Sequence, residues 1–368
     1  MLKLFLLLAI CMVLAYCSQK SILVVPLTEK FKLDIPFVLI IFLLTCLVGL
    51  RTFYDDTYTY IKGFEDAESL RNYIDSDPDL FSNPLYYAFQ AFFKYHISNN
   101  SHHFLFINAF FSISSMIWFI RKYSVNFSFS ILIFFCIGMI LVPMSAMKQG
   151  IAIGFSLIAI DQMLKKRYIL FYLILFIAFL FHAYTIILVV LPLFIGRPWT
   201  IFTYFTICVI AFLLITFEST ISTILSVSDE VGKNLNEEAL LDSQGINLFR
   251  LAVFSVPPLL SLFFQDLLNK TYTKEKNLLM HMSILSFLIM GMGIFSAANL
   301  FGRSAIYFEI GSIVVLPWII SEMFDRESHN VAHVIVGGCY LAFFAYMVQD
   351  FSSAYRAIEL MDFIKTFI

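Results

Sequence analysis

The stretch IPFVLIIFLLTCLVGL, residues 35–50, contains no charged side chain. The next ten residues, RTFYDDTYTY at 51–60, bring together an arginine, two aspartates and three tyrosines. In hydrocarbon a helix satisfies every backbone N–H and C=O within its own segment, so an uncharged run of this kind is typical of a membrane helix. The stretch therefore predicts a helix that crosses apolar surroundings and ends at a polar rim.

The whole chain is strongly apolar. Of its 368 residues, 60% are hydrophobic and 14% are charged, and the mean hydropathy is +0.85. No soluble domain of this size needs so much apolar surface. We predict an all-α fold, a polytopic transmembrane helical bundle that forms one integral membrane domain over residues 1–368. The net charge of -2 gives no reason to expect a nucleic-acid partner.

Apolar runs between polar breaks predict about twelve spans. The first run lacks a clean small-residue cleavage site, so we interpret it as a span and not as a signal peptide. The run at 83–96 is too short and too polar for a crossing, and we expect it to be interfacial or re-entrant. The spans lie near residues 2–17, 36–50, 104–120, 127–143, 149–164, 168–181, 183–195, 199–217, 248–267, 278–298, 304–322 and 331–349.

Short basic loops indicate the orientation, because Lys and Arg are enriched on the cytoplasmic side. Five clusters fall on one face if 168–195 is a hairpin of two short spans that turns at FHAY. The N-terminus, the outer loops 51–103 and 218–247, and an amphipathic tail at 350–368 then lie outside. The clusters are Lys20, Lys30 and Lys32; Arg121 and Lys122; Lys165, Lys166 and Arg167; Arg197; and Lys270, Lys274 and Lys276.

Four cations depart from this pattern, since they lie where outward loops join apolar helices: Arg51, Lys148, Arg250 and Arg303. Any one of them could extend its charge to the headgroup level. Four on one side fit an anionic ligand better, because the planar guanidinium donates in pairs to phosphate oxygens. A pyrophosphate on an isoprenoid tail would present its charge at this depth.

Candidate acid–base groups lie on the same side. Asp55 and Asp56 closely follow Arg51, and nearby cations would keep an aspartate ionised, able to accept a proton or to bind a metal. An ion pair that orders the loop is the alternative. His182, in AFLFHAYTI, lies at the proposed hairpin turn and could be a base or a hydrogen-bonded structural residue.

Four stretches in this order resemble the EpsG-like family of bacterial polysaccharide polymerases, which are of the Wzy type. The first is GLRTFYDDTYTY at 49–60, and the second is MKQGIAIGFSLIAIDQMLKKRYILFYLILFIAFLFHAYTIILVVLPLF at 147–194. INLFRLAVF at 246–254 and NLFGRSAIYFEIGSIVVLP at 299–317 complete the set. Lys148 departs from the arginine expected before Gln-Gly, and it offers a point charge in place of a bidentate fork.

The resemblance implies a glycosyltransferase that polymerises undecaprenyl pyrophosphate-linked oligosaccharide repeat units into a surface polysaccharide. It implies a multi-pass protein of the bacterial inner membrane with its active site facing the periplasm or the outside. Asp56 or His182 would deprotonate the acceptor hydroxyl, without a metal or cofactor. The substrate-binding residues would be Arg51, Tyr60, Lys148, Gln149, Arg250 and Arg303.

The partners so implied are the lipid-linked glycan donor and acceptor and membrane lipid, with a chain-length regulator and a flippase as further candidates. Three other functions are open to the sequence. A glycosyltransferase that uses a polyprenyl monophosphate sugar would need fewer outer cations. A flippase or transporter would carry mid-span charges and inverted repeats. A membrane O-acyltransferase could use His182 as a base, but would leave the four cations without a role.

Overall fold

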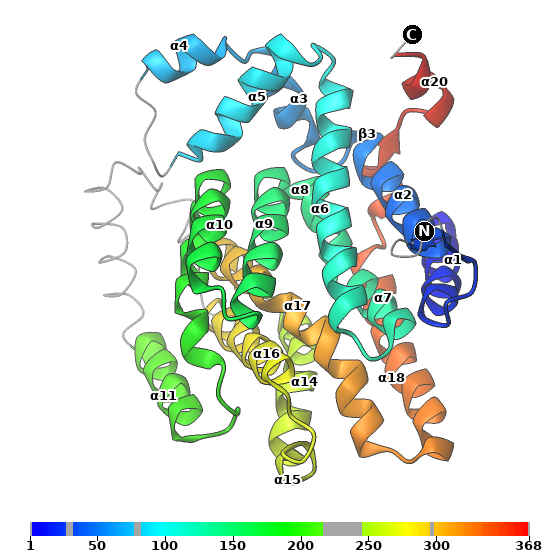
Figure 1. Cartoon of the computed structure of the whole chain (residues 1–368), viewed down its shortest axis with the longest axis vertical. Coiled ribbons are helices and arrows are strands. Elements are labelled where there is room, and N and C mark those ends of the chain that lie inside the picture. Colours follow the sequence, from blue (N-terminus) through cyan, green and yellow to red (C-terminus); the bar gives the residue numbers. More distant parts are fainter. Residues whose placement is uncertain (1, 27–31, 77–81, 216–244, 295–297, 367–368) are drawn as a thin grey trace.

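The computed structural model describes residues 2–26, 32–76, 82–215, 245–294 and 298–366, and most of them are helical (Figure 1). The predicted outer loop 218–247 lies outside these residues except for its last three. The N-terminal part comprises α1 (Leu2–Gln19), β1 (Val24–Pro26), β2 (Lys32–Asp34), α2 (Ile35–Gly49), β3 (Arg51–Phe53), α3 (Thr57–Glu65), α4 (Leu70–Asp75), α5 (Pro84–His96), α6 (Ser101–Tyr123), α7 (Phe127–Cys136), η1 (Met139–Leu141), α8 (Val142–Ser145) and α9 (Met147–Leu164). The rest comprises α10 (Tyr168–Phe181), η2 (Ala183–Phe194), α11 (Ile201–Ile215), α14 (Leu248–Phe263), α15 (Gln265–Leu268), α16 (Lys274–Met292), α17 (Ala298–Met323), α18 (Arg326–Met347), α19 (Phe351–Ala354), β4 (Arg356–Ala357) and α20 (Leu360–Lys365).

The helical membrane class is confirmed, but the count of about twelve spans is not. Within the described ranges, four helices are long and apolar enough to cross a membrane, or five if the bent pair α7 and η1–α8 is one span. Several other apolar helices are short: α2, α10, η2, α11 and α14. At 1.5 Å per residue, a 15-residue helix such as α2 covers about 22 Å of a hydrocarbon core that is about 30 Å thick.

The segment expected to be one span at 127–143 is broken. α7 and the following η1–α8 helix meet at 67°, and Gly138 between them has a φ of +80°. That left-handed conformation favours glycine, and a Cβ there would lie 2.6 Å from Cε of Met347. Beyond the bend, Pro143 packs closely against Gly150, where a Cβ would lie 3.0 Å from Cα of Pro143. This contact fixes the start of α9.

The expected break in 168–195 is present. α10 ends at Phe181, His182 is extended with φ -157° and ψ 113°, and η2 begins at Ala183. The Ala183 N–H donates to Oδ1 of Asn83 at 3.3 Å, which joins this turn to the residue before α5. The turn therefore lies beside α5 at one end of the bundle.

The segment 83–96 forms α5, which lies with α3 and α4 across one end of the molecule, the upper end in Figure 1. Its aromatic side chains pack onto the start of α6. The ring of Phe104 stacks on Phe64 at 4.9 Å and meets Phe93 at 5.4 Å, and Tyr86 lies 6.0 Å from the same ring. We call these three helices the cap helices.

The C-terminal tail folds back onto the junction of α2 and α3. β4 pairs antiparallel with β3, with Arg51 opposite Ala357, and the hydroxyl of Tyr355 donates to the Leu47 carbonyl at 2.6 Å. The tail is therefore two short helices with a strand between them, where the sequence suggested one amphipathic helix. Phe363 is buried against Phe106, with ring centroids 4.9 Å apart.

The basic loops lie at the opposite end from the cap helices, apart from Lys30, which lies outside the described residues. Nε of Arg121 donates to Oγ of Ser18 at 2.9 Å, and Nε2 of Gln19 donates to the Val125 carbonyl at 2.9 Å. Nδ2 of Asn277 donates to the Ile195 carbonyl at 3.3 Å. In Figure 1 the region of α15 lies at the lower end, and the loop after α9 lies at the end of α9 that faces away from the cap helices.

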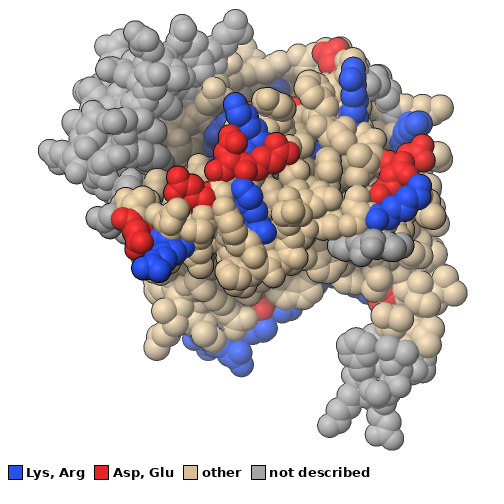
Figure 2. All heavy atoms as spheres, turned by 90° about the horizontal axis from the view of Figure 1, so that it is seen from above, with Lys and Arg blue, Asp and Glu red and all other residues tan. Residues whose placement is uncertain are grey.

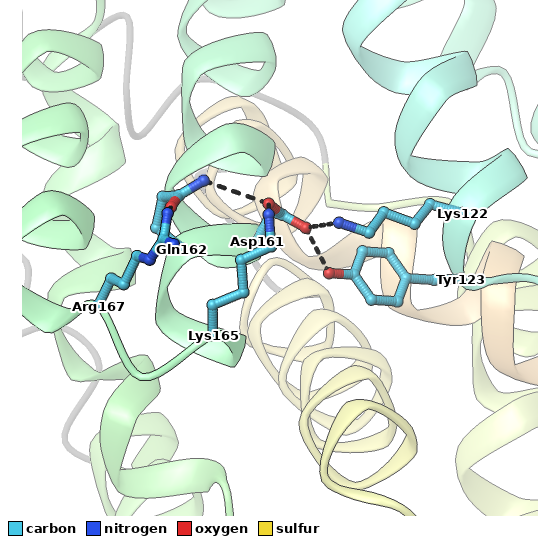
Figure 3. A network of polar contacts seen from close by, with 6 residues as sticks. All are labelled: Lys122, Tyr123, Asp161, Gln162, Lys165 and Arg167. Atoms are coloured by element: carbon cyan, nitrogen blue, oxygen red, sulfur yellow. Dashed lines mark hydrogen bonds and ion pairs between the residues drawn. The ribbon is translucent and has the colours of Figure 1, made fainter. Parts of the chain in front are cut away.

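At that end a polar network joins α6 to α9 (Figure 3). The carboxylate of Asp161, only 2% exposed, accepts hydrogen bonds from Lys122, from Nζ of Lys165 at 2.6 Å and from the hydroxyl of Tyr123 at 2.7 Å. The lysines are 34% and 45% exposed, so their other protons reach water. Nε2 of Gln162 also donates to Oδ2 of Asp161, at 3.2 Å, so this carboxylate accepts four hydrogen bonds, from α6, from α9 and from the residue after α9.

We predict that Asp161→Ala lowers stability by about 1–2 kcal/mol, because it removes a buried acceptor while the partly exposed lysines can rehydrate. Thermal unfolding of the purified chain in detergent measures the effect, as a midpoint lower by a few degrees. Asp75→Ala is the matched control, because Asp75 pairs with Arg71 at 3.8 Å and both side chains are largely exposed. Equal midpoints for the two variants would contradict the prediction.

Candidate functional site beneath the cap helices

The first turn of α9 is tied to two distant segments. The Met147 N–H donates to the hydroxyl of Tyr60 at 3.0 Å, and Nε2 of Gln149 donates to the Arg303 carbonyl at 2.6 Å. Gln149 is fully buried, and its Oε1 has no partner among the described residues. α3, α9 and α17 therefore meet at this point, although they are far apart in sequence.

Lys148 lies between these two anchors and points toward α5. Its Nζ donates to the hydroxyl of Tyr87 at 2.6 Å and lies 4.9 Å and 4.1 Å from the ring centroids of Tyr86 and Tyr87. Aromatic faces attract a cation through their quadrupole. These two tyrosines therefore hold a positive charge in place without neutralising it.

Arg51 is the most buried cation of the region. Its side chain is 0% exposed, Nε donates to Oγ1 of Thr57 at 3.0 Å, and Nη1 donates to the Val48 carbonyl at 2.5 Å. Nη2 has no partner in the described part of the chain. Burial lowers the pKa of Arg51 to about 10, and Tyr60 opposes this shift. The group therefore remains charged at neutral pH.

Asp55 and Asp56 are exposed just before α3. Partial burial raises the pKa of Asp55, as does the neighbouring Asp56, while Arg303 opposes the shift. The cations thus do not hold this carboxyl below its usual pKa, as the sequence suggested for an aspartate here. Asp55 also has a φ of +44°, a left-handed conformation that aspartate tolerates better than most residues. The carboxylate of Asp56 forms no cap bond to α3.

Arg303 is exposed near the start of α17, within electrostatic range of Asp55, Tyr60 and Tyr184. Viewed from the cap-helix end, acidic and basic side chains lie next to one another in small groups (Figure 2). This face thus combines both signs of charge, as a site with cations and a proton acceptor requires.

His182 belongs to a buried hydroxyl network. Its Nδ1 lies 2.8 Å from the hydroxyl of Tyr307, which lies 3.2 Å from Oγ1 of Thr185, and that hydroxyl donates to the His182 carbonyl at 2.8 Å. The imidazole and the two hydroxyls therefore form one hydrogen-bonded chain, which fixes the orientation of the His182 ring.

Arg250 contacts a buried carboxylate and an aromatic ring. Its Nη2 lies 3.4 Å from Oε1 of Glu309, which is 1% exposed, and its Cζ lies 5.5 Å from the ring centroid of Phe254. Glu309 follows Arg303 by six residues, which is about 9 Å along a helix. Arg250 is therefore held deeper along α17 than Arg303.

The structure brings Tyr60, Lys148, Gln149, Arg303 and the aspartates together beneath the cap helices. His182 is connected to the same end through Tyr307 of α17. Arg51 is buried within electrostatic range of Tyr60, and Arg250 is bound to Glu309. Sequence reasoning missed Tyr307, Glu309, Tyr86 and Tyr87. Tyr307 and Glu309 are polar residues inside an apolar run, a signal that the sequence did contain.

Comparison with protein families matches residues 34–361 to the EpsG family. The chain belongs to the EpsG family. This membership identifies it as a membrane protein of polysaccharide biosynthesis. No curated protein and no solved structure matches the chain. In this EpsG-family chain, no cluster of three or more His, Cys, Asp or Glu side chains within the described ranges could hold a metal ion.

We predict that Tyr60→Phe loosens the start of α9, because the Met147 N–H belongs to the first helical turn and has no partner within the helix. The loss of one hydrogen bond of about 1 kcal/mol should speed exchange of this amide about fivefold. Hydrogen exchange of the detergent-solubilised chain measures this rate. Tyr58→Phe is the control, because Tyr58 is 66% exposed; similar exchange in both variants would refute the role of Tyr60.

Proposed function

We propose that this chain polymerises undecaprenyl pyrophosphate-linked oligosaccharide repeat units into a surface polysaccharide on the outer face of the bacterial inner membrane. The observation that carries the proposal is the junction of α3, α9 and α17 through Tyr60 and Gln149, in which Lys148 is the chain neighbour of the residue that bonds the Arg303 carbonyl. EpsG-family membership supports the reaction class. The basic loops would face the cytoplasm and the cap helices the outside.

Lys148 and Arg303 are the cations that we assign to the diphosphate. Lys148 is the second residue of α9, where the helix dipole also favours an anion, and Arg303 is the sixth described residue of α17. Arg51 adds a buried positive charge near Tyr60, with one nitrogen of its guanidinium without a partner in the described part of the chain. Arg250 is the deeper member of the substrate-binding set, and Glu309 offsets part of its charge.

The chemistry that this arrangement supports is transfer of a glycan from a diphosphate to a hydroxyl. The bond between C1 of the donor sugar and the diphosphate oxygen breaks, and the acceptor oxygen forms a new bond to C1. The acceptor proton passes to a base, and the departing diphosphate keeps the bonding electron pair. Negative charge thus grows next to Lys148 and Arg303, where preorganised cations lower the barrier most.

Two groups are candidates for the base. The exposed carboxylate of Asp56 has no cap bond to α3 to compete for its lone pairs. His182 has its imidazole oriented by Tyr307 and Thr185. Either would act by accepting the proton of the acceptor hydroxyl as the new glycosidic bond forms.

We predict that Arg303→Ala abolishes long chains while the protein still inserts normally, because the leaving diphosphate loses its exposed guanidinium partner. Gel analysis of surface glycans and of lipid-linked material should show single repeat units and no polymer. Arg71→Ala is the control, an arginine of α4 whose side chain is 90% exposed. Long glycans in Arg303→Ala would refute the electrostatic role, and loss of every surface repeat would point to a flippase.

We predict that Asp56→Asn reduces turnover more than binding, because an amide cannot accept the proton. A general base contributes roughly 100-fold or more, so kcat should fall by about that factor with little change in KM. The measurement uses purified chain with lipid-linked repeat units, and Asp55→Asn and His182→Asn are assayed in parallel. An unchanged kcat for Asp56→Asn with a large fall for His182→Asn would make His182 the base.

A further inference from the structure

The cap helices line a partly open pocket, and none of the site residues predicted from the sequence is among its lining residues. It has a volume of about 270 Å³ and lies between α3, α4 and α5. This is just below the roughly 300–1,000 Å³ of pockets that hold drug-sized ligands, so its occupant is small. Its lining includes Gly63, Glu68, Tyr73, Ser76, Tyr87 and Gln90.

The lining combines aromatic faces with hydrogen-bonding groups. The rings of Tyr73 and Tyr87 lie 6.1 Å apart and are tilted by 43°, so they converge without stacking face to face. Glu68 offers a carboxylate, Ser76 a hydroxyl and Gln90 an amide. A sugar ring has apolar C–H faces that pack on aromatic rings and hydroxyls that exchange hydrogen bonds with such polar groups.

The pocket is physically joined to the candidate site. Tyr87 lines the pocket, and its hydroxyl accepts a hydrogen bond from Nζ of Lys148 at 2.6 Å. The same Nζ lies 4.1 Å from the ring centroid of Tyr87. A diphosphate bound at Lys148 would therefore have its attached sugar within reach of the same tyrosine. The pocket and the cationic site thus fit successive parts of one molecule.

We propose that this pocket is a saccharide subsite, which holds one or two sugar rings of the lipid-linked glycan next to the diphosphate at Lys148. The inference rests on the proposed function for the identity of that glycan. Tyr73 and Tyr87 stack against the ring faces, while Glu68, Ser76 and Gln90 select among the ring hydroxyls. Specificity for the repeat unit then resides partly in the cap helices.

Gly63 offers a direct way to close the pocket. A Cβ at this position would meet only Nε2 of Gln90, at 3.7 Å, which is ordinary contact. A Cβ at Gly63 therefore meets no backbone atom of another segment within 4 Å, and we expect a larger side chain to project into the pocket that Gly63 lines. Gly63→Leu occupies the space, whereas Tyr73→Ala removes one of the two rings.

The test uses the full chain in detergent and saturation-transfer NMR with a panel of soluble di- and trisaccharides of neutral hexoses and N-acetylhexosamines. We expect at least one of them to bind the unaltered protein, and its affinity to fall at least tenfold in Gly63→Leu and in Tyr73→Ala. Phe92→Ala is the control, because Phe92 is an α5 aromatic that is 42% exposed and does not line the pocket. No binding to the unaltered protein, or equal binding in all four proteins, would overturn the subsite.

A second arm separates this proposal from the proposed function. Arg303→Ala should keep saccharide binding, because a free sugar carries no diphosphate, while it loses polymer in cells. Saccharide binding that depends on Tyr73, together with normal long chains in Arg303→Ala, would leave the subsite in place and refute the electrostatic role on which the proposed function depends. Loss of polymer in Arg303→Ala, together with saccharide binding that is unchanged in Tyr73→Ala and Gly63→Leu, would refute the subsite and leave the proposed function in place.

Discussion

The anchoring of α9 at both of its ends is the constraint on which the candidate site depends. At one end Asp161 gathers donors from α6 and from the end of α9 itself. At the other end, about 18 Å away by helix geometry, Met147 and Gln149 bond to α3 and α17. Polar groups buried in an apolar bundle cannot exchange a protein hydrogen bond for one to water, so these bonds fix where the helix starts. Lys148 lies within that fixed turn.

Three of the ten buried polar side-chain atoms that lack a partner in the described ranges belong to residues around this junction. Nη2 of Arg51, Oε1 of Gln149 and the hydroxyl of Tyr86 are buried without a partner in the described ranges. Buried polar atoms in folded proteins are nearly always paired. Three such atoms around one junction are what a site for a polar, charged substrate would leave open. The left-handed backbone at Asp55 is the kind of local strain that accumulates at functional sites.

Particular residues show how far sequence reasoning reached. Charge and the length of apolar runs are local features, and they predicted the polar segment after α2, the break at His182 and a segment 83–96 that does not cross the bundle. The bend at Gly138 was not predicted, because it depends on Met347 of α18 filling the space beside that glycine. The ion pair of Arg250 with Glu309 was missed for a similar reason, since the two residues meet only when α14 packs on α17.

The sequence by itself determined that this chain is a helical membrane protein with basic loops toward one side, because apolar run length and charge placement act segment by segment. It also carried the family pattern over residues 34–361. Only the tertiary structure decided how each cation is held: Lys148 contacts Tyr87, the Arg303 carbonyl bonds to Gln149, Arg51 is buried and Arg250 is bound to a carboxylate. The physical reason is that hydrogen bonds such as Gln149 to the Arg303 carbonyl join segments 154 residues apart, and no local pattern encodes such a contact.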